Sequence, residues 1–140
     1  MSTTTTPQSG EFCWNELMTP DTKKAQAFYT ELLGWTSQDH DMGDMTYTMF
    51  MSGDKRMGGM FQTPKDKVDQ IPPHWMSYIS VEDVEETLEK AKALGADVIV
   101  PVTTVANKGR FIVITGPTGA PIAFWQCIQE DPKDESTNIY

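Results

Sequence analysis

Two short stretches of this chain end a helical pattern in the same way. In FYTELLGW (28–35) and AKALGADVIV (91–100), apolar residues at helical spacing lead to Leu-Gly, and strand-like residues follow at once. Glycine readily adopts the left-handed backbone conformation that ends many helices, which a residue with a Cβ resists. The same device used twice, about sixty residues apart, predicts that one structural unit occurs two times in the chain.

The first unit starts with an extended segment at 12–18, after which Thr19 is expected to cap a helix with Pro20 in its first turn. The residues expected on one face of this helix are Ala25, Phe28, Tyr29, Leu32 and Leu33. Gly34 ends the helix, and three extended segments follow at 35–40, 45–51 and 57–62. The predicted order is strand, helix and three strands.

The second unit repeats that order. An extended segment at 74–81 precedes Asp83 and Glu86, whose spacing indicates a helix start. Val84, Leu88 and Ala91 continue the helical pattern as far as Gly95, and the three extended segments that follow are 97–105, 109–115 and 121–127. We therefore predict module one at 11–62, a linker at 63–73 and module two at 74–128, with a flexible tail at 1–10 and an acidic tail at 129–140.

Composition excludes several classes of partner. The net charge of -9 over 140 residues argues against nucleic acid and anionic membranes, because both would repel the domain. Cys13 and Cys127 lack the spacing of a disulfide framework or a structural zinc site. The polar start MSTTTTPQSG does not look like a secretory signal, and no apolar run is long enough to span a bilayer. We expect a cytoplasmic protein.

The repeated order, with DTKKAQAFYTELLGW in one half and DVEETLEKAKALGADV in the other, resembles the vicinal oxygen chelate superfamily over residues 11–128. This superfamily includes glyoxalase I, extradiol dioxygenases and bleomycin resistance proteins. The segments most similar to its glyoxalase-like, uncharacterised branch are FCWNEL, HWMSYISVEDVEETLEKAKALGA and GRFIVITGPTGAPIAFWQ. The resemblance implies an α+β fold in which two βαβββ modules form a curved mixed sheet, a cup with the helices on its outer face. It also implies a homodimer.

The resemblance further implies where a catalytic metal would be held, namely on the first and last strands of each module. Matching the two halves of the chain puts Trp14, Gly59, Met76 and Ala123 at those positions. None of them supplies the imidazole or carboxylate that Zn, Fe, Ni or Mn sites require. We therefore predict no metal and no other cofactor, with a divalent ion held by displaced ligands as the alternative.

Two titratable residues are candidates for catalysis. Alternation puts Glu16 on the same strand face as Trp14, inside the predicted cup. It is either the ion-pair partner of Arg56 or Arg110, or a site acid with a raised pKa. His74 follows two prolines at the start of a strand and is either a hydrogen-bonded structural imidazole or a catalytic base.

Methionines and aromatic residues dominate the strand faces that are expected to line the cup. Together with Arg110, the predicted ligand-binding residues are Trp14, Tyr47, Met49, Met76, Tyr78 and Trp125. Such a surface suits a small apolar or aromatic compound. We expect a metal-free, glyoxalase-like or bleomycin resistance-like protein that binds one. The alternatives are a metal-dependent lyase, isomerase or dioxygenase, a metal-free acid/base enzyme using Glu16 or His74, and a structural dimer whose cup is filled by its own side chains.

Overall fold

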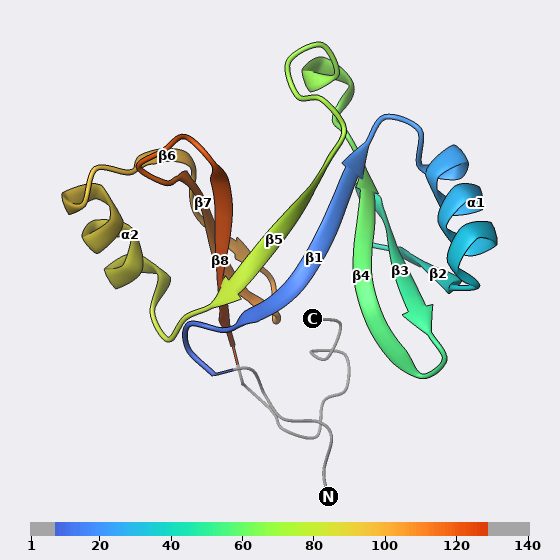
Figure 1. Cartoon of the computed structure of the whole chain (residues 1–140), viewed down its shortest axis with the longest axis horizontal. Coiled ribbons are helices and arrows are strands. Elements are labelled where there is room, and N and C mark those ends of the chain that lie inside the picture. Colours follow the sequence, from blue (N-terminus) through green and yellow to red (C-terminus); the bar gives the residue numbers. More distant parts are fainter. Residues whose placement is uncertain (1–7, 129–140) are drawn as a thin grey trace, which may run out of the picture. The chain divides into compact units, whose positions relative to one another are not determined.

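The computed structural model describes residues 8–128 and divides into two compact units (Figure 1). One unit contains residues 15–76, and the other contains residues 8–14 together with 77–128. The predicted acidic tail and residues 1–7 of the predicted N-terminal tail lie outside the described residues. Gly10, which we predicted in that tail, donates its backbone N–H to the Ser80 carbonyl. Within the described residues, neither helix has the length and apolar character required to cross a membrane.

Module one has the predicted order of strand, helix and three strands. Its elements are β1 (Phe12–Thr19), α1 (Thr22–Leu33), β2 (Thr36–Asp41), β3 (Thr46–Ser52) and β4 (Lys55–Gln62). The strands lie in the order β2-β3-β4-β1, with β1 parallel to β4 and the other neighbours antiparallel. A parallel neighbour requires a crossover connection, which α1 and the two hairpin strands provide.

Module two repeats this topology. Its elements are β5 (His74–Ser80), α2 (Val84–Ala93), β6 (Asp97–Val105), β7 (Gly109–Thr115) and β8 (Pro121–Cys127). The strands lie in the order β5-β8-β7-β6, and β5 is parallel to β8. The α+β class and the two βαβββ modules are therefore confirmed. A short 3-10 helix, η1 (Lys65–Lys67), lies in the segment between them and was not predicted.

Each helix packs on one face of the sheet of its own module. In module one the buried cluster is Leu17, Phe50 and Met60, with Ala25, Tyr29, Trp35 and Met57 packed against it. In module two the buried cluster is Val84, Ile112 and Ile114, and the partly buried residues around it include Leu88 and Ala91. The opposite face of each sheet also carries buried residues, including Tyr47 in module one and Ala123 in module two.

The start of α1 differs from the prediction. Asp21, not Thr19, caps the helix, because the Asp21 side chain accepts a hydrogen bond from the Lys24 backbone N–H. Thr19 is still part of β1, where it pairs with Gln62 of β4 and its carbonyl accepts from the Thr63 N–H. Pairing in the sheet thus moves the helix start two residues further along the chain.

The expected apolar face of α1 is only partly buried. Ala25 and Tyr29 pack against the module-one core, as expected. Phe28, Leu32 and Leu33, however, keep 56%, 61% and 51% of their surface exposed. The helical stop at Gly34 is confirmed by its φ of 70°, and the stop at Gly95 is confirmed by a φ of 98°.

Candidate functional site

The face of the module-one sheet away from α1 contains four residues that the strand register aligns. Glu16 of β1 and Met49 of β3 are both the partners of Gly59 of β4, whereas Leu17 and Thr48 are partners of the core residue Met60. Since neighbouring residues on a strand face opposite ways, Glu16, Met49 and Gly59 lie on the side away from the helix. Tyr47, two residues before Met49, shares this side. We refer to these four residues as the Glu16 face.

The centre of the Glu16 face is a hydrogen bond between two buried side chains. The Tyr47 hydroxyl donates to Glu16 Oε2 at 2.7 Å. Glu16 is 7% exposed and Tyr47 is 3% exposed. A phenol that donates to an ionised carboxylate makes a charge-assisted hydrogen bond, roughly twice as strong as a bond between neutral groups. This bond supplies one polar partner for the buried Glu16 side chain, as the burial of a polar group requires.

Gly59 lies directly beneath the Tyr47 ring. A Cβ built on Gly59 would overlap the Tyr47 hydroxyl oxygen and Cζ, and would lie 2.5 Å from Cε2. Contacts this close do not occur between real side chains, so position 59 accepts only glycine while the ring keeps its place. The absence of a side chain at Gly59 is what allows Tyr47 to reach Glu16.

Module two has aromatic residues at the corresponding places. Tyr78 of β5 is the register partner of Ala123 in β8, just as Glu16 is the partner of Gly59. The Tyr78 ring meets the Phe111 ring edge to face, with centroids 6.2 Å apart. Ala123 is fully buried, and Trp125 is 6% exposed. The side of module two away from α2 therefore carries the aromatic residues Tyr78 and Phe111 where module one carries the Glu16–Tyr47 pair.

Trp14 and Met76 occupy the metal-ligand positions that the resemblance implies on the first strand of each module. The two side chains differ in exposure. Trp14 is 7% exposed and belongs to the unit that contains residues 77–128. Met76 is half-buried and belongs to the unit of residues 15–76. Neither side chain carries a group that ligates a hard cation.

His74 has a local hydrogen-bond partner. Its Nδ1 lies 2.8 Å from the Pro72 carbonyl oxygen, which requires a proton on that nitrogen for a hydrogen bond. This bond holds the ring against the chain just before β5, and the structural and catalytic alternatives for His74 both stay predictions.

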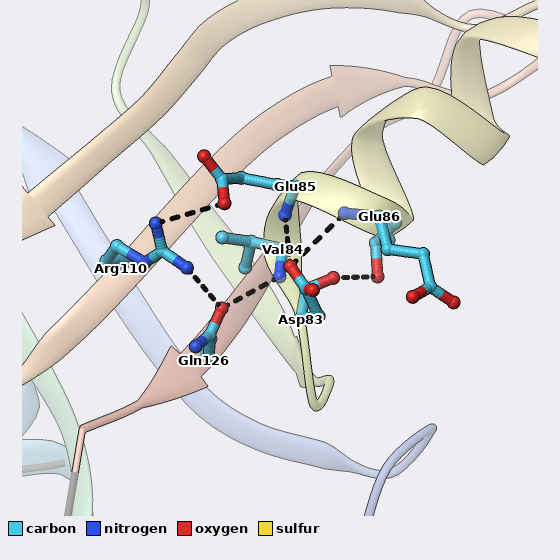
Figure 2. A network of polar contacts seen from close by, with 7 residues as sticks. Asp83, Val84, Glu85, Glu86, Arg110 and Gln126 are labelled. Carbon is cyan, nitrogen blue, oxygen red and sulfur yellow. Dashed lines mark hydrogen bonds and ion pairs between the residues drawn. The ribbon is translucent and has the colours of Figure 1, made fainter.

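Arg110 lies on the other face of module two, beside the start of α2 (Figure 2). Its guanidinium donates to Gln126 Oε1 at 3.1 Å and pairs with Glu85 at 3.4 Å. The same Gln126 oxygen accepts the buried Val84 backbone N–H at 2.9 Å. Arg110, one of the two residues that we considered as an ion-pair partner of Glu16, forms an ion pair with Glu85.

Sequence reasoning missed one buried charged residue. Lys108 is only 8% exposed, although it lies in the Asn107-Lys108-Gly109 turn between β6 and β7. Asn107 has a φ of 61°, and the Trp125 ring covers Gly109, whose added Cβ would lie 2.5 Å from Trp125 Cζ2. A lysine in a turn is ordinarily exposed, so nothing in the local sequence indicated its burial.

A cavity of about 300 Å³ in module one lies on the α1 side and not on the Glu16 face. Its lining includes the core residue Leu17 together with Phe28, Tyr29 and Pro73. The cavity is thus separate from every residue that the sequence predicted as catalytic or ligand-binding.

Comparison with known protein families shows to which family the chain belongs. The model of the Glyoxalase/Bleomycin resistance protein/Dioxygenase superfamily matches residues 12–124. The chain belongs to this superfamily. The glyoxalase-superfamily match begins in β1 and ends in β8, so it includes both modules.

Two relatives support this membership. The glyoxylase-named protein CFP32 of Mycobacterium bovis is 33% identical over 115 residues, which is 81% of this chain and 44% of the relative. The anthracycline biosynthesis protein DauV of a Streptomyces species is 30% identical over 112 residues, which is 79% of this chain and 39% of the relative. This glyoxalase-superfamily chain therefore spans less than half the length of these curated relatives.

A solved structure shows the same fold. Methylmalonyl-CoA epimerase from Mycobacterium tuberculosis superimposes with a TM-score of 0.61 and 13% identity, covering 89% of this chain and 92% of the epimerase. At this identity the likeness concerns the fold alone.

The residues present do not fit the metal that enzymes of the superfamily hold. The expected positions carry Trp14, Gly59, Met76 and Ala123, and the Tyr47 ring covers the one at Gly59. Within residues 8–128, no three His, Cys, Asp or Glu residues gather in a way that could hold a metal ion. No step of any reaction is therefore assigned to a metal.

Proposed function

We propose that this glyoxalase-superfamily chain binds a small apolar or aromatic compound without a metal ion, and that the Glu16 face takes part in the binding. The observation that carries the proposal is the buried Tyr47–Glu16 hydrogen bond over Gly59. It combines a fixed carboxylate with the apolar Met49 side chain on one buried surface. A few placed polar groups in an apolar setting are typical of small-molecule sites.

The other predicted ligand-binding residues enlarge the apolar surface available in each unit. Met76 is half-buried in the unit of Glu16, and its flexible thioether suits several ligand shapes. Trp14, Tyr78 and Trp125 are buried in the other unit, where they provide aromatic surface for flat molecules. We assign the hydrogen bonding of a ligand on the Glu16 face to Glu16 and its apolar contacts on that face to Met49.

The names of one relative and of the family suggest the first compounds to test. One relative is named for anthracycline biosynthesis, and the family description includes bleomycin resistance. We propose titrating the protein with an anthracycline and with metal-free bleomycin, using calorimetry. A ligand that binds only the folded state also raises the unfolding temperature. Saturable binding that Glu16→Gln weakens at least tenfold supports the proposal, and binding unaffected by Glu16→Gln contradicts the role of the Glu16 face.

The metal-free part of the proposal needs its own measurement. We expect protein purified without added metal to contain far less than one transition-metal ion per chain by elemental analysis. A near-stoichiometric metal that survives dialysis would contradict this expectation. The two measurements are independent, because a metal-free protein can still fail to bind the test compounds.

A second candidate function is metal-free acid/base catalysis, and the same hydrogen bond favours it. A phenol bound to a carboxylate can exchange its proton with that carboxylate, so Glu16 and Tyr47 together can remove or return a proton at a bound substrate. Exchange of a substrate carbon-bound proton with deuterium from solvent, followed by NMR, would test this function. Exchange that persists in Glu16→Gln would contradict it.

A further inference from the structure

The place in module two that corresponds to Gly59 has room for a side chain. Ala123 occupies the place in module two that Gly59 occupies in module one, as the register with Tyr78 and Glu16 shows. Ala123 has a Cβ, whereas a Cβ at Gly59 would overlap the Tyr47 phenol. Space for a side chain at this place thus exists in one module and is taken in the other by a residue from β3.

We propose that Tyr47 is the residue that closes module one to a metal ion. Its phenol fills the room that a liganding side chain at position 59 would need, and its hydroxyl engages the neighbouring carboxylate of Glu16. This inference rests on the metal-free part of the proposed function, to which it adds the residue responsible. A glutamate introduced at position 59 would place a second carboxylate beside that of Glu16 on the paired strand. Paired strands lie about 4.8 Å apart, so the two carboxylates would form a site for a hard cation once the Tyr47 ring is removed.

The steric part of the proposal is tested first, by a thermal unfolding cycle. The proteins compared are the parent, Gly59→Ala, Tyr47→Ala and the double variant. With Tyr47 present, the added methyl group must displace the ring, and we expect the unfolding temperature to fall by about 5 °C or more. In the Tyr47→Ala background the three atoms nearest to the added methyl group are gone, so we expect a change below about 2 °C.

One outcome of these unfolding measurements would contradict the proposal. Equal losses from Gly59→Ala in the two backgrounds would mean that the ring does not occupy the space at position 59, and would overturn the proposal. Gly116→Ala is a matched control, because its added Cβ would meet nothing closer than the Ala120 carbonyl oxygen at 3.8 Å. We expect its effect to be the same with and without Tyr47.

The metal part of the proposal is tested with Mn²⁺ alone. We compare Gly59→Glu with Gly59→Glu/Tyr47→Ala, following free Mn²⁺ by electron paramagnetic resonance. The double variant should bind Mn²⁺ at least tenfold more tightly than the single variant. Mn²⁺ should also raise the unfolding temperature of the double variant. Adding Glu16→Gln to the double variant should abolish the gain, because one of the two carboxylates is then lost.

The outcomes separate this proposal from the proposed function. Equal Mn²⁺ binding by Gly59→Glu with and without Tyr47 would overturn the closing role of Tyr47. Binding by neither variant would overturn the assignment of position 59 as a liganding place. Tight binding by the parent protein would instead contradict the metal-free proposal itself.

Discussion

At the scale of single residues, the sequence placed Glu16 and Tyr47 on buried strand faces but did not predict their bond. Alternation along a strand indicates which side a residue faces, and both residues are indeed buried. Their contact, however, joins positions 31 apart in the sequence and depends on β3 and β1 both flanking β4. It also depends on Gly59, whose role appears only when the Tyr47 ring lies over it.

Removing the Tyr47 hydroxyl should lower the stability of the fold. We expect Tyr47→Phe to reduce the free energy of unfolding by about 1–3 kcal/mol, because the buried Glu16 carboxylate loses a hydrogen-bond donor. Equilibrium unfolding in urea measures this loss. Tyr29→Phe is the matched control, since the Tyr29 hydroxyl accepts a hydrogen bond from Trp75, which is 40% exposed. A smaller loss for Tyr47→Phe than for Tyr29→Phe would contradict the importance of the pair.

Cys13 and Cys127 should react with alkylating reagents at different rates. Burial raises the pKa of the Cys13 thiol from 9.0 to about 11, and the nearby Cys127 thiolate adds to the rise. The thiolate is the form that reacts with alkylating reagents. With a pKa of about 11, only about one Cys13 thiol in a hundred is ionised at pH 9. We expect iodoacetamide to modify the exposed Cys127 first, and the Cys13 rate to keep rising with pH up to about 11.

Mass spectrometry of peptides taken during the alkylation reaction checks this order. Cys127→Ser should leave Cys13 as the slow site. A Cys13 rate that levels off below pH 9 would show that its thiol is not protected in the way the structure indicates.

At the scale of elements, the order of strands and helices followed from the sequence, but the start of α1 did not. Asp83 has the expected capping role, and its side chain accepts hydrogen bonds from the Glu85 and Glu86 backbone N–H groups. The Thr19 side chain could also have capped α1, but β1 continues through Thr19 and Asp21 is the residue that caps the helix. Which of two polar residues caps a helix depends on where the preceding strand stops pairing, and a local pattern does not contain that information.

The two caps should differ in strength. Asp83→Ala should cost about 1–2 kcal/mol and Asp21→Ala about 1 kcal/mol, because Asp83 accepts two backbone N–H groups and Asp21 accepts one. Urea unfolding followed by circular dichroism measures both losses. Replacing each aspartate with asparagine should restore most of the stability. A larger loss from Thr19→Ala than from Asp21→Ala would support the original prediction for α1.

At the scale of the whole molecule, the repeat in the sequence and the compact units of the structure divide the chain differently. The sequence repeat begins its second copy at residue 74, whereas residues 74–76 belong to the same unit as most of module one. Residues 8–14, which include the first three residues of β1, belong with residues 77–128. A repeat is recognised from the order of elements along the chain, and this order does not report which segments make the most contacts.

The predicted homodimer remains a prediction at this scale. The exposed Phe28, Leu32 and Leu33 side chains on α1 leave apolar surface that water does not favour. Sedimentation equilibrium at micromolar concentration should give twice the chain mass of 15.7 kDa. A mass equal to that of one chain over the same concentration range would contradict the prediction.

Gln126 also bears on the order in which module two can be completed while the protein is being synthesised. Val84 is fully buried, and its backbone N–H donates to a side chain that lies 42 residues later in the chain. The ribosome therefore releases α2 well before the partner that its first turn requires. Until Gln126 has emerged, this N–H must stay hydrated, because burying it without an acceptor is costly. The first turn of α2 can thus be sealed from water only when the last strand arrives.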